Sequence, residues 1–495
     1  MSSYLAARVA AAEGRSAAAS GDYASALTGW PDDPAVAVRA YREAMISGDE
    51  ALALRAARVM EAEQVAPIDV ALLDLAIAAR KRDRAAYDAA LVRIDAGALR
   101  IVAPVLRAWA AWDRKQPVEA ALDSAGKEPV ARRLADEHRI LLALAAKRMG
   151  SQSALVLLQA MSAPADTRIA AAQIMAGRGD EAQARALLSD PLVASDRRAL
   201  GAKPDLGFGV SRLLARVAAE LVGEGPRPLV IALTRTALIA DPYNDRARLL
   251  MAEALSRDEA WDAAIAAVEG VAPRGAFAHR AAVVRVGLLA SADRAGEALM
   301  LARGLATAKN ATVDDWQIYG DQLIAAKRPG DAAIWYERVT RADPPVPWAA
   351  WLQYGGALDQ AGQAEPADAA LAKAVELGPD EPLALNYLGY ARIERGETGA
   401  PSLGLLEKAS KLAPDDASIT DSLGWGYFRA GQAGRALPLV ERAAMAEPAN
   451  AEIADHLGDI YWALGRFYEA RYSWRAAALT AEAPLAGRVA HKLTL

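Results

Sequence analysis

The pattern of apolar and polar positions repeats along the second half of the chain. Each repeat is marked by a large apolar residue followed by glycine, and successive marks are 34 or 35 residues apart. These pairs are Tyr319-Gly320, Tyr354-Gly355, Leu388-Gly389, Leu423-Gly424 and Leu457-Gly458. A fixed period of this length predicts a repeat protein, in which each repeat is one supersecondary unit and neighbours stack to bury a continuous core.

Other residue types recur in phase with these glycines. Twelve residues after the glycine stands a small residue: Ala332, Ala367, Ala436 and Ala470. Four residues further on stands a larger one: Tyr336, Leu371, Val440 and Trp474. Each unit then ends near a proline: Pro344, Pro379, Pro414 and Pro448. Because proline cannot continue a helix, we expect it to close the second helix of a helical hairpin.

With Trp316 and Trp351 three residues before the first two pairs, the pattern becomes W-x2-L-G-x2-Y…A-x3-F…P, which resembles the tetratricopeptide repeat family. The resemblance implies an all-α fold, an α-solenoid in which helical hairpins stack into a right-handed superhelix. The glycine of the first helix and the alanine of the second are expected to keep the helix crossing short, since nothing larger fits between closely packed backbones.

The phase of the repeat extends upstream to about Ser211. We therefore predict a regular array of about eight hairpins over residues 210–484, followed by a capping helix over residues 485–495 that hides the last hairpin. The tail carries apolar residues at helical spacing: Leu485, Val489 and Leu493.

Residues 1–188 are predicted to hold degenerate helical repeats of the same kind. Alanines in second-helix contexts recur there at drifting intervals of 27 to 35 residues: Ala24, Ala51, Ala86, Ala120, Ala154 and Ala182. The glycine- and proline-containing segment 189–209 interrupts the series, and we predict a joint between two solenoid segments at this point.

Composition and charge narrow the class of protein. Alanine, the strongest helix former, is abundant, whereas phenylalanine occurs only 4 times. The net charge is −5 without a basic cluster, so nucleic-acid binding lacks its electrostatic driver. The absence of cysteine excludes disulfides, thiolate catalysis and cysteine-ligated zinc. No apolar run approaches the roughly 18 residues of a membrane span, and the amino end resembles an alanine-rich helix rather than a signal peptide.

No motif for catalysis or metal binding is apparent. His456 stands beside Asp455 and near Asp459, but without paired ligand spacing a surface histidine is the favoured interpretation. The segment Gly207–Gly209 lacks the third glycine and the Lys-Ser/Thr ending of a phosphate loop, so it is interpreted as a helix-start loop. We therefore predict no catalytic residue, no metal and no cofactor, and a protein that is not an enzyme.

The family resemblance implies where a partner binds. In tetratricopeptide proteins the first helices line the concave groove, and the positions just before and after the recurring pair point into it. At these positions the chain has amides, carboxylates, aromatic residues and one arginine: Gln317, Asp321, Asn386, Tyr390, Asp421, Trp425, Arg429, Asp455, Asp459 and Trp462. Such residues can pair with an extended peptide backbone and supply rigid apolar contact area.

Each of these residues also has a structural interpretation. The aspartates can equally be solvated helix faces or packing between hairpins. For Trp425 and Trp462, packing between hairpins is favoured over ligand contact, because large aromatic residues in repeats usually fill hairpin interfaces.

Residues 382–478 carry a closer resemblance. The strings LNYLGYARIERGE, DDASITDSLGWGYFRAG and AEIADHLGDIYWALGRFYEARYSWRAA resemble a Gram-negative group of exported tetratricopeptide adaptors, which deliver substrates to a periplasmic carboxyl-terminal processing protease. The resemblance implies a periplasmic or envelope-associated protein, whose leader would precede this sequence. The lipidation cysteine of some members is missing.

The leading hypothesis is therefore a non-catalytic scaffold or adaptor that binds a peptide or protein in its groove, with an envelope protease as one partner. The first alternative is a cytoplasmic chaperone-like or assembly protein of the same fold. The second is an enzyme subunit with a site at the joint between Ser189 and Gly209.

Overall fold

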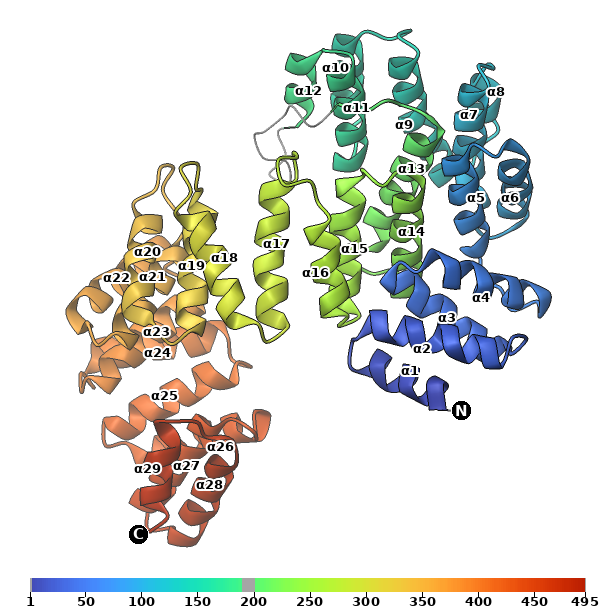
Figure 1. The fold of residues 1–495 in the computed structure, drawn as a ribbon. Helices are drawn as coiled ribbons and strands as arrows, with labels where there is room; N and C mark the ends of the chain where they lie inside the picture. Colours follow the sequence, from blue (N-terminus) through green and yellow to red (C-terminus); the bar gives the residue numbers. More distant parts are fainter. Residues whose placement is uncertain (1, 189–200, 495) are drawn as a thin grey trace. The chain divides into compact units, whose positions relative to one another are not determined.

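The computed structural model describes residues 2–188 and 201–494, and all regular secondary structure in these ranges is helical (Figure 1). The described residues form 29 α-helices and one short 3-10 helix, Arg100–Val102, with no strand among them. The predicted all-α solenoid class is confirmed. None of the helices in the described ranges is long and apolar enough to cross a membrane.

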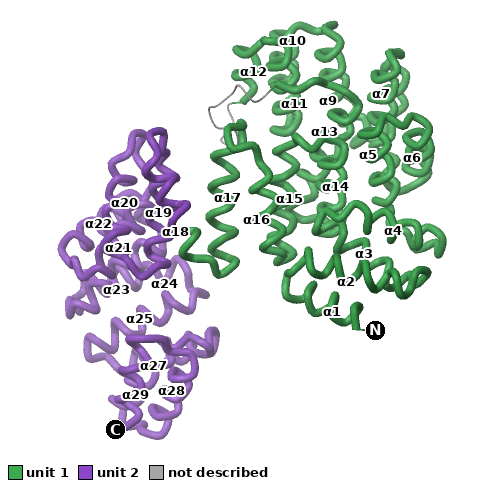
Figure 2. Tube along the Cα trace, viewed as in Figure 1, with its two compact units in different colours: residues 1–298 green, residues 299–495 purple. Residues whose placement is uncertain are grey.

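The chain divides into two compact units, which we call unit 1 (Met1–Ala298) and unit 2 (Leu299–Leu495) (Figure 2). The boundary between them falls inside helix α18 (Ala295–Ala306). Residues 189–200 of the predicted joint lie outside the described residues, and its end, from Leu206, already belongs to a helix. The predicted division at this joint stays a prediction.

Unit 2 is built from consecutive helical hairpins. Its helices after α18 are α19 (Val313–Ala325), α20 (Pro329–Thr340), α21 (Trp348–Gln360), α22 (Ala364–Leu377), α23 (Pro382–Glu394), α24 (Ala400–Leu412), α25 (Ala417–Arg429), α26 (Ala433–Ala446), α27 (Ala451–Ala463), α28 (Phe467–Thr480) and α29 (Leu485–Lys492). The odd-numbered helices from α19 to α27 are the first helices of their hairpins. Second helices α20, α22, α24 and α26 end two to four residues before the recurring prolines.

The recurring glycines of unit 2 allow the two helices of a hairpin to approach closely. A Cβ atom placed on Gly424 would lie 2.5 Å from a methyl group of Val440, and one on Gly458 would overlap the Trp474 ring. Gly320, Gly355 and Gly389 face Tyr336, Leu371 and Leu406 in the same way. The recurring alanines of the second helices are fully buried beside these contacts. The larger residue of the pattern therefore fills the space above the glycine of its own hairpin.

Unit 1 also begins with hairpins. Its first twelve α-helices are α1 (Ser2–Ala12), α2 (Ser16–Gly29), α3 (Pro34–Ser47), α4 (Glu50–Ala62), α5 (Val70–Lys81), α6 (Arg84–Ala96), α7 (Ala103–Asp113), α8 (Glu119–Asp123), α9 (Pro129–Ala145), α10 (Ser151–Ala160), α11 (Ala165–Gly177) and α12 (Glu181–Leu187). The alanines that the sequence singled out all lie in even-numbered helices, as predicted.

The register of these early repeats differs from the one that the alanines suggested. The fourth residue of the second helix is buried in all six hairpins before α13, as it is in α20, α22, α26 and α28, and in the first three hairpins it is Ala19, Ala53 and Tyr87. These three residues are 34 apart, so the repeat period holds from the start of the chain.

Helix α13 (Leu206–Leu221) lies at the centre of unit 1. Every residue from Leu206 to Ala218 is buried, and the helix packs against α5, α7 and α11 as well as its own partner, α14 (Arg227–Ala240) (Figure 1). Helix α14 in turn packs against α3 and α5. In unit 1, the chain itself therefore covers the face formed by the first helices. The unit continues through α15 (Asp245–Arg257), α16 (Trp261–Glu269) and α17 (Ala278–Ser291).

Charged side chains on α13 are buried in this packing and are paired. Arg216 donates to Glu137 of α9 with its Nε atom at 3.1 Å, and the side chains are 5% and 2% exposed. Thr167 of α11 donates to the same carboxylate at 2.5 Å. Arg212 donates to Gln173 and to Asp241. Because each buried charge has partners, α13 can be polar in places and still lie in the core.

The segment Gly207–Gly209 is not the predicted helix-start loop, since it forms the first turns of α13. A Cβ atom on Gly209 would overlap the Trp109 ring, and one on Gly207 would lie 2.5 Å from the carbonyl oxygen of Ala240. These glycines serve the close approach of α13 to α7 and to the end of α14.

Candidate functional site

Eight of the ten predicted partner-binding residues lie on three neighbouring first helices of unit 2. Helix α23 contacts α25, and α25 contacts α27, so the three helices form one continuous layer, which we call the first-helix face. The predicted residues in this layer are Asn386 and Tyr390 of α23, Asp421, Trp425 and Arg429 of α25, and Asp455, Asp459 and Trp462 of α27. Asn386, Asp421, Trp425 and Asp455 are buried, and the others are at least partly exposed.

A buried histidine joins α27 to α25. His456 Nδ1 lies 2.8 Å from Asp421 Oδ2, and its ring stacks on Trp425 with 3.9 Å between ring centroids and 11° between planes. Burial disfavours the charged imidazole, but the carboxylates of Asp421, Glu452 and Asp455 together outweigh it and raise the pKa of His456. The interpretation of His456 as a surface histidine was wrong, because this contact takes the ring into the helix interface.

Two acceptor oxygens beside this cluster have no partner. The Oδ1 atoms of Asn386 and Asp421 are buried and make no hydrogen bond among the described residues. The side chains are 8% and 5% exposed. A buried acceptor without a partner costs free energy, so each of these oxygens calls for a donor that the described residues do not supply. The two residues occupy equivalent positions in successive repeats, two residues before the recurring pair.

Aromatic and basic side chains of the first-helix face are held by glutamates that the sequence reasoning did not select. Trp425 Nε1 donates to Glu394 at 2.7 Å, and Arg429 donates to the same carboxylate at 3.0 Å. Tyr390 of α23 reaches past α25 and donates its hydroxyl to Glu452 of α27 at 2.9 Å. Burial, together with Glu452, raises the pKa of Tyr390. These contacts fix the orientation of the rings.

The carboxylates of Asp455 and Asp459 are engaged within the protein. Lys492 of α29 donates to Asp455 at 2.7 Å and to Asp459 at 2.7 Å, while Trp474 Nε1 donates to Asp459 at 3.1 Å. Trp462 packs on Trp474, with 5.3 Å between ring centroids. At this end of unit 2, the predicted site residues hold the last helix against its neighbours.

The two remaining predicted residues lie on α19, away from this cluster. Asp321 accepts a hydrogen bond from Tyr336 at 2.6 Å and a longer one from Gln353 at 3.4 Å. Burial raises the pKa of Asp321, although the Tyr336 hydroxyl opposes the shift. Gln317 is half-buried.

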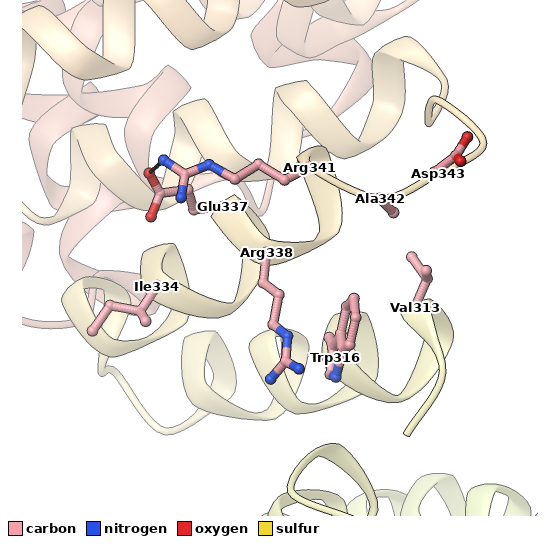
Figure 3. A pocket seen from close by; sticks show the side chains of 8 residues that line it. All are labelled: Val313, Trp316, Ile334, Glu337, Arg338, Arg341, Ala342 and Asp343. Carbon is pink, nitrogen blue, oxygen red and sulfur yellow. Dashed lines mark hydrogen bonds and ion pairs between the residues drawn. The ribbon is translucent and has the colours of Figure 1, made fainter. Parts of the chain in front are cut away.

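A pocket of about 500 Å³ opens between α19 and α20 (Figure 3). The Arg338 guanidinium lies 4.0 Å from the centre of the Trp316 ring, the geometry of a cation–π contact. Arg341 and Glu337 pair with each other at 2.6 Å along its wall. Trp316 Nε1 is buried and makes no hydrogen bond among the described residues.

The described residues contain no cluster of three or more histidine, cysteine, aspartate or glutamate side chains that could hold a metal ion. The first-helix face carries unpaired acceptors, oriented aromatic rings and an exposed arginine.

Comparison with known proteins extends no further than the fold. No family model and no curated protein matches the chain. A thermophilic tetratricopeptide repeat protein from Thermus thermophilus is 22% identical, covers 37% of this chain and 100% of its own, and has a TM-score of 0.34. One from Parabacteroides merdae is 13% identical, covers 50% and 97%, and has a TM-score of 0.44. YrrB, described as having an unusual peptide-binding site, is 18% identical, covers 34% and 86%, and has a TM-score of 0.29. No conclusion about this chain's partner rests on them.

Proposed function

We propose that the protein is a non-catalytic scaffold that binds a peptide or protein partner on the first-helix face of unit 2. The observation that carries the proposal is the pair of buried, unpartnered acceptors on Asn386 and Asp421. An extended peptide presents backbone N–H donors that match such acceptors. The half-buried Tyr390 offers apolar area beside them, and Trp425, buried and stacked on His456, supports this surface from below.

The packing of unit 1 favours unit 2 as the place where a partner binds. Its first helices are covered by α13 and α14, and those contacts already use the equivalent face. A partner that binds by the first helices is therefore expected on unit 2.

The test is binding to an arrayed library of unstructured peptides of about ten residues, a length that an extended peptide-recognition surface accommodates. The wild-type protein is expected to retain a subset of the library. Asn386→Ala and Asp421→Asn should each lower the affinity for the selected peptides about three- to tenfold. This is the effect of losing one hydrogen bond, or of removing the charge on its acceptor.

The control is Met445→Ala, at a position of α26 that is 84% exposed and outside the first-helix face. It should bind as the wild type does, and helix content by circular dichroism should be unchanged in all variants. Equal peptide affinity in wild type, Asn386→Ala and Asp421→Asn would place the binding surface elsewhere. The purified chain is expected to show no hydrolase activity.

The finer proposal is that the scaffold presents substrates to a carboxyl-terminal processing protease of the envelope. It rests on the resemblance of residues 382–478 to exported adaptors. Crosslinking and capture from envelope and cytosolic fractions test it separately: recovery of such a protease from the envelope supports the adaptor role. Recovery of cytosolic partners alone favours the chaperone-like or assembly alternative.

A further inference from the structure

Unit 1 contains an apolar pocket of about 800 Å³, which we call the α3–α14 pocket. It is formed by one side of α3, by the connection between α4 and α5, and by the first turns of α14. Its volume lies within the range of about 300–1,000 Å³ that is typical of small-molecule sites. At its mouth, Val38 and Ile68 are 46% and 47% exposed, so apolar surface faces solvent there.

The walls of the pocket are fixed relative to each other. Arg235 of α14 is largely buried and donates to the carbonyl oxygens of Met45 at 2.8 Å and Ile46 at 2.6 Å. Both carbonyls belong to the last turn of α3, which has few intrahelical donors of its own. Since Met45 and Ile46 also line the pocket, this contact holds the α3 wall against the α14 wall.

The charges around the pocket favour an anion at its mouth. Arg39 is exposed on the α3 wall and makes no ion pair among the described residues. Arg42 lies 3.0 Å from Asp258, but that carboxylate also lies 3.9 Å from Arg227, so one negative charge is shared by two guanidinium groups. Glu43 also lies near Arg42 and Asp258, so the unpaired positive charge of the rim is that of Arg39.

The interior offers little that a peptide backbone needs. Pro67, Pro226 and Pro228 line the pocket and have no N–H group to donate. The buried Tyr41 hydroxyl is already committed to Asp69, at 2.6 Å. The buried N–H and C=O groups of a peptide would lack partners here, whereas a hydrocarbon chain needs none. Burial raises the pKa of Asp69, although the hydrogen bond from Tyr41 opposes the shift.

We propose that the α3–α14 pocket binds an aliphatic carboxylate, a free fatty acid, with its hydrocarbon chain among Val38, Ile68 and Leu229 and its carboxylate at Arg39. The chain would bury the apolar surface at the mouth, and the guanidinium would pair with the carboxylate. This site is separate from the first-helix face of unit 2 and does not depend on it.

The first test is calorimetric titration of the full chain with octanoate, decanoate and dodecanoate. Affinity is expected to rise up to about fourfold for each added methylene, as burial of apolar surface requires. Val38→Glu places a carboxylate at the mouth and should weaken dodecanoate at least about tenfold, through repulsion and lost apolar contact. Val156→Glu is the matched control, since Val156 lies on α10 outside the pocket and is 55% exposed.

The second test separates the contribution of the ligand's carboxylate from that of its hydrocarbon chain. Arg39→Gln should weaken dodecanoate about tenfold, the value of one charge-assisted contact, and leave dodecanol unchanged. A dodecanoate analogue carrying a photoreactive diazirine should label Pro67–Asp69 and Pro226–Ala232. Circular dichroism melting must show that the variants stay folded.

Three results with the fatty acids and the alcohol would overturn the proposal. They are the absence of measurable dodecanoate binding, equal binding by the wild type and Val38→Glu, and equal loss of dodecanoate and dodecanol in Arg39→Gln. Capture of apolar carboxyl-terminal peptides at this pocket in place of dodecanoate would also overturn it, because the occupant would then be a polypeptide.

Discussion

Two buried histidines show how strongly the neighbours of one side chain decide its charge. In unit 1, His138 accepts a hydrogen bond on Nδ1 from Trp109 Nε1 at 2.9 Å, and burial together with Arg216 lowers its pKa to about 3. In unit 2, burial of His456 is outweighed by Asp421 together with Glu452 and Asp455, and its pKa is raised. His138 is therefore neutral at neutral pH, while the pKa of His456 lies above its ordinary value.

We predict that the two histidines titrate on opposite sides of the ordinary value of about 6.5. Ring NMR signals of histidine-labelled protein should show His456 protonated at pH 6.5, and His138 neutral at every pH at which the protein stays folded above about 4. His456→Asn and His138→Asn assign the signals. A neutral His456 ring at pH 6 would contradict the prediction.

The sign of the stability effect follows from the direction of each pKa shift. Because the pKa of His456 is raised by folding, its contribution is fully present below about pH 6.5 and is lost as pH rises through the folded pKa. Because the pKa of His138 is lowered, its contribution is present above about pH 6.5 and is lost as pH falls. Acidification below neutrality is thus expected to weaken unit 1 while unit 2 keeps the His456 contribution.

The sequence placed the residues of the first-helix face in register but did not identify their partners. The period alone puts Asn386, Asp421 and Asp455 at equivalent positions. Their contacts depend on which residue of the next repeat lies alongside, and His456 is 35 residues after Asp421. Arg429 and Glu394 are also 35 residues apart. Pairs of opposite charge one period apart are the signal in the sequence that would have revealed these contacts.

At the scale of the hairpin, one small residue decides how closely two helices pack. The side chains that face the recurring glycines differ in size, from Val440 to Trp474, yet each fills the space above its glycine. A methyl group added at any of these glycines would overlap the side chain that faces it. This explains why the glycine-marked period was easy to read in unit 2.

We predict that Gly424→Ala destabilises unit 2 by about 1–3 kcal/mol, the usual cost of overpacking a core. A Cβ atom there would lie 2.5 Å from Val440 and 3.3 Å from the carbonyl oxygen of Ala436. The matched control is Gly434→Ala in α26 of the same hairpin, where no atom lies within 4 Å of the new Cβ. It should stabilise by about 0.5–1 kcal/mol, because alanine has the higher helix propensity. Denaturant unfolding followed by circular dichroism measures both, and equal effects would contradict the packing argument.

The same scale explains why the register of unit 1 could not be read from its alanines. The equivalent position is the fourth residue of the second helix, Ala19 in α2 and Ala53 in α4, but other alanines of these helices are buried as well. In the third hairpin, Tyr87 takes that position, so a search for alanine alone loses the phase. The helices could be predicted from composition, but the period could not be followed through a position whose residue type changes.

At the scale of the molecule, the two units use their first helices differently. In unit 1 these helices pack against α13 and α14, whereas α23, α25 and α27 of unit 2 form the first-helix face with its unpaired acceptors. Local repeat logic predicts neither the burial of α13 nor the pairing of Arg216 with Glu137. These residues are 79 apart in sequence, so their contact arises only from the path of the whole unit.

We predict that Arg216→Met destabilises unit 1 by about 3–5 kcal/mol, because it leaves Glu137 buried without its cation. The double variant Glu137→Leu/Arg216→Met should recover most of this loss, since no uncompensated charge remains. Thermal unfolding by circular dichroism of both single variants and the double variant completes the cycle. If the double variant lost the sum of the two single effects, the ion pair would not be coupled.

The central position of α13 has a consequence for how the polypeptide is made. The first six hairpins are synthesised before residue 206, and the surfaces that later contact α13 are then uncovered. Unit 1 can reach its final packing only after α13 and α14 have emerged, whereas the hairpins of unit 2 can be added one after another. A nascent chain halted before α13 is therefore expected to recruit chaperones and proteases. A chain halted after α14 has emerged should recruit fewer of them, because the contacts of α13 and α14 can then form.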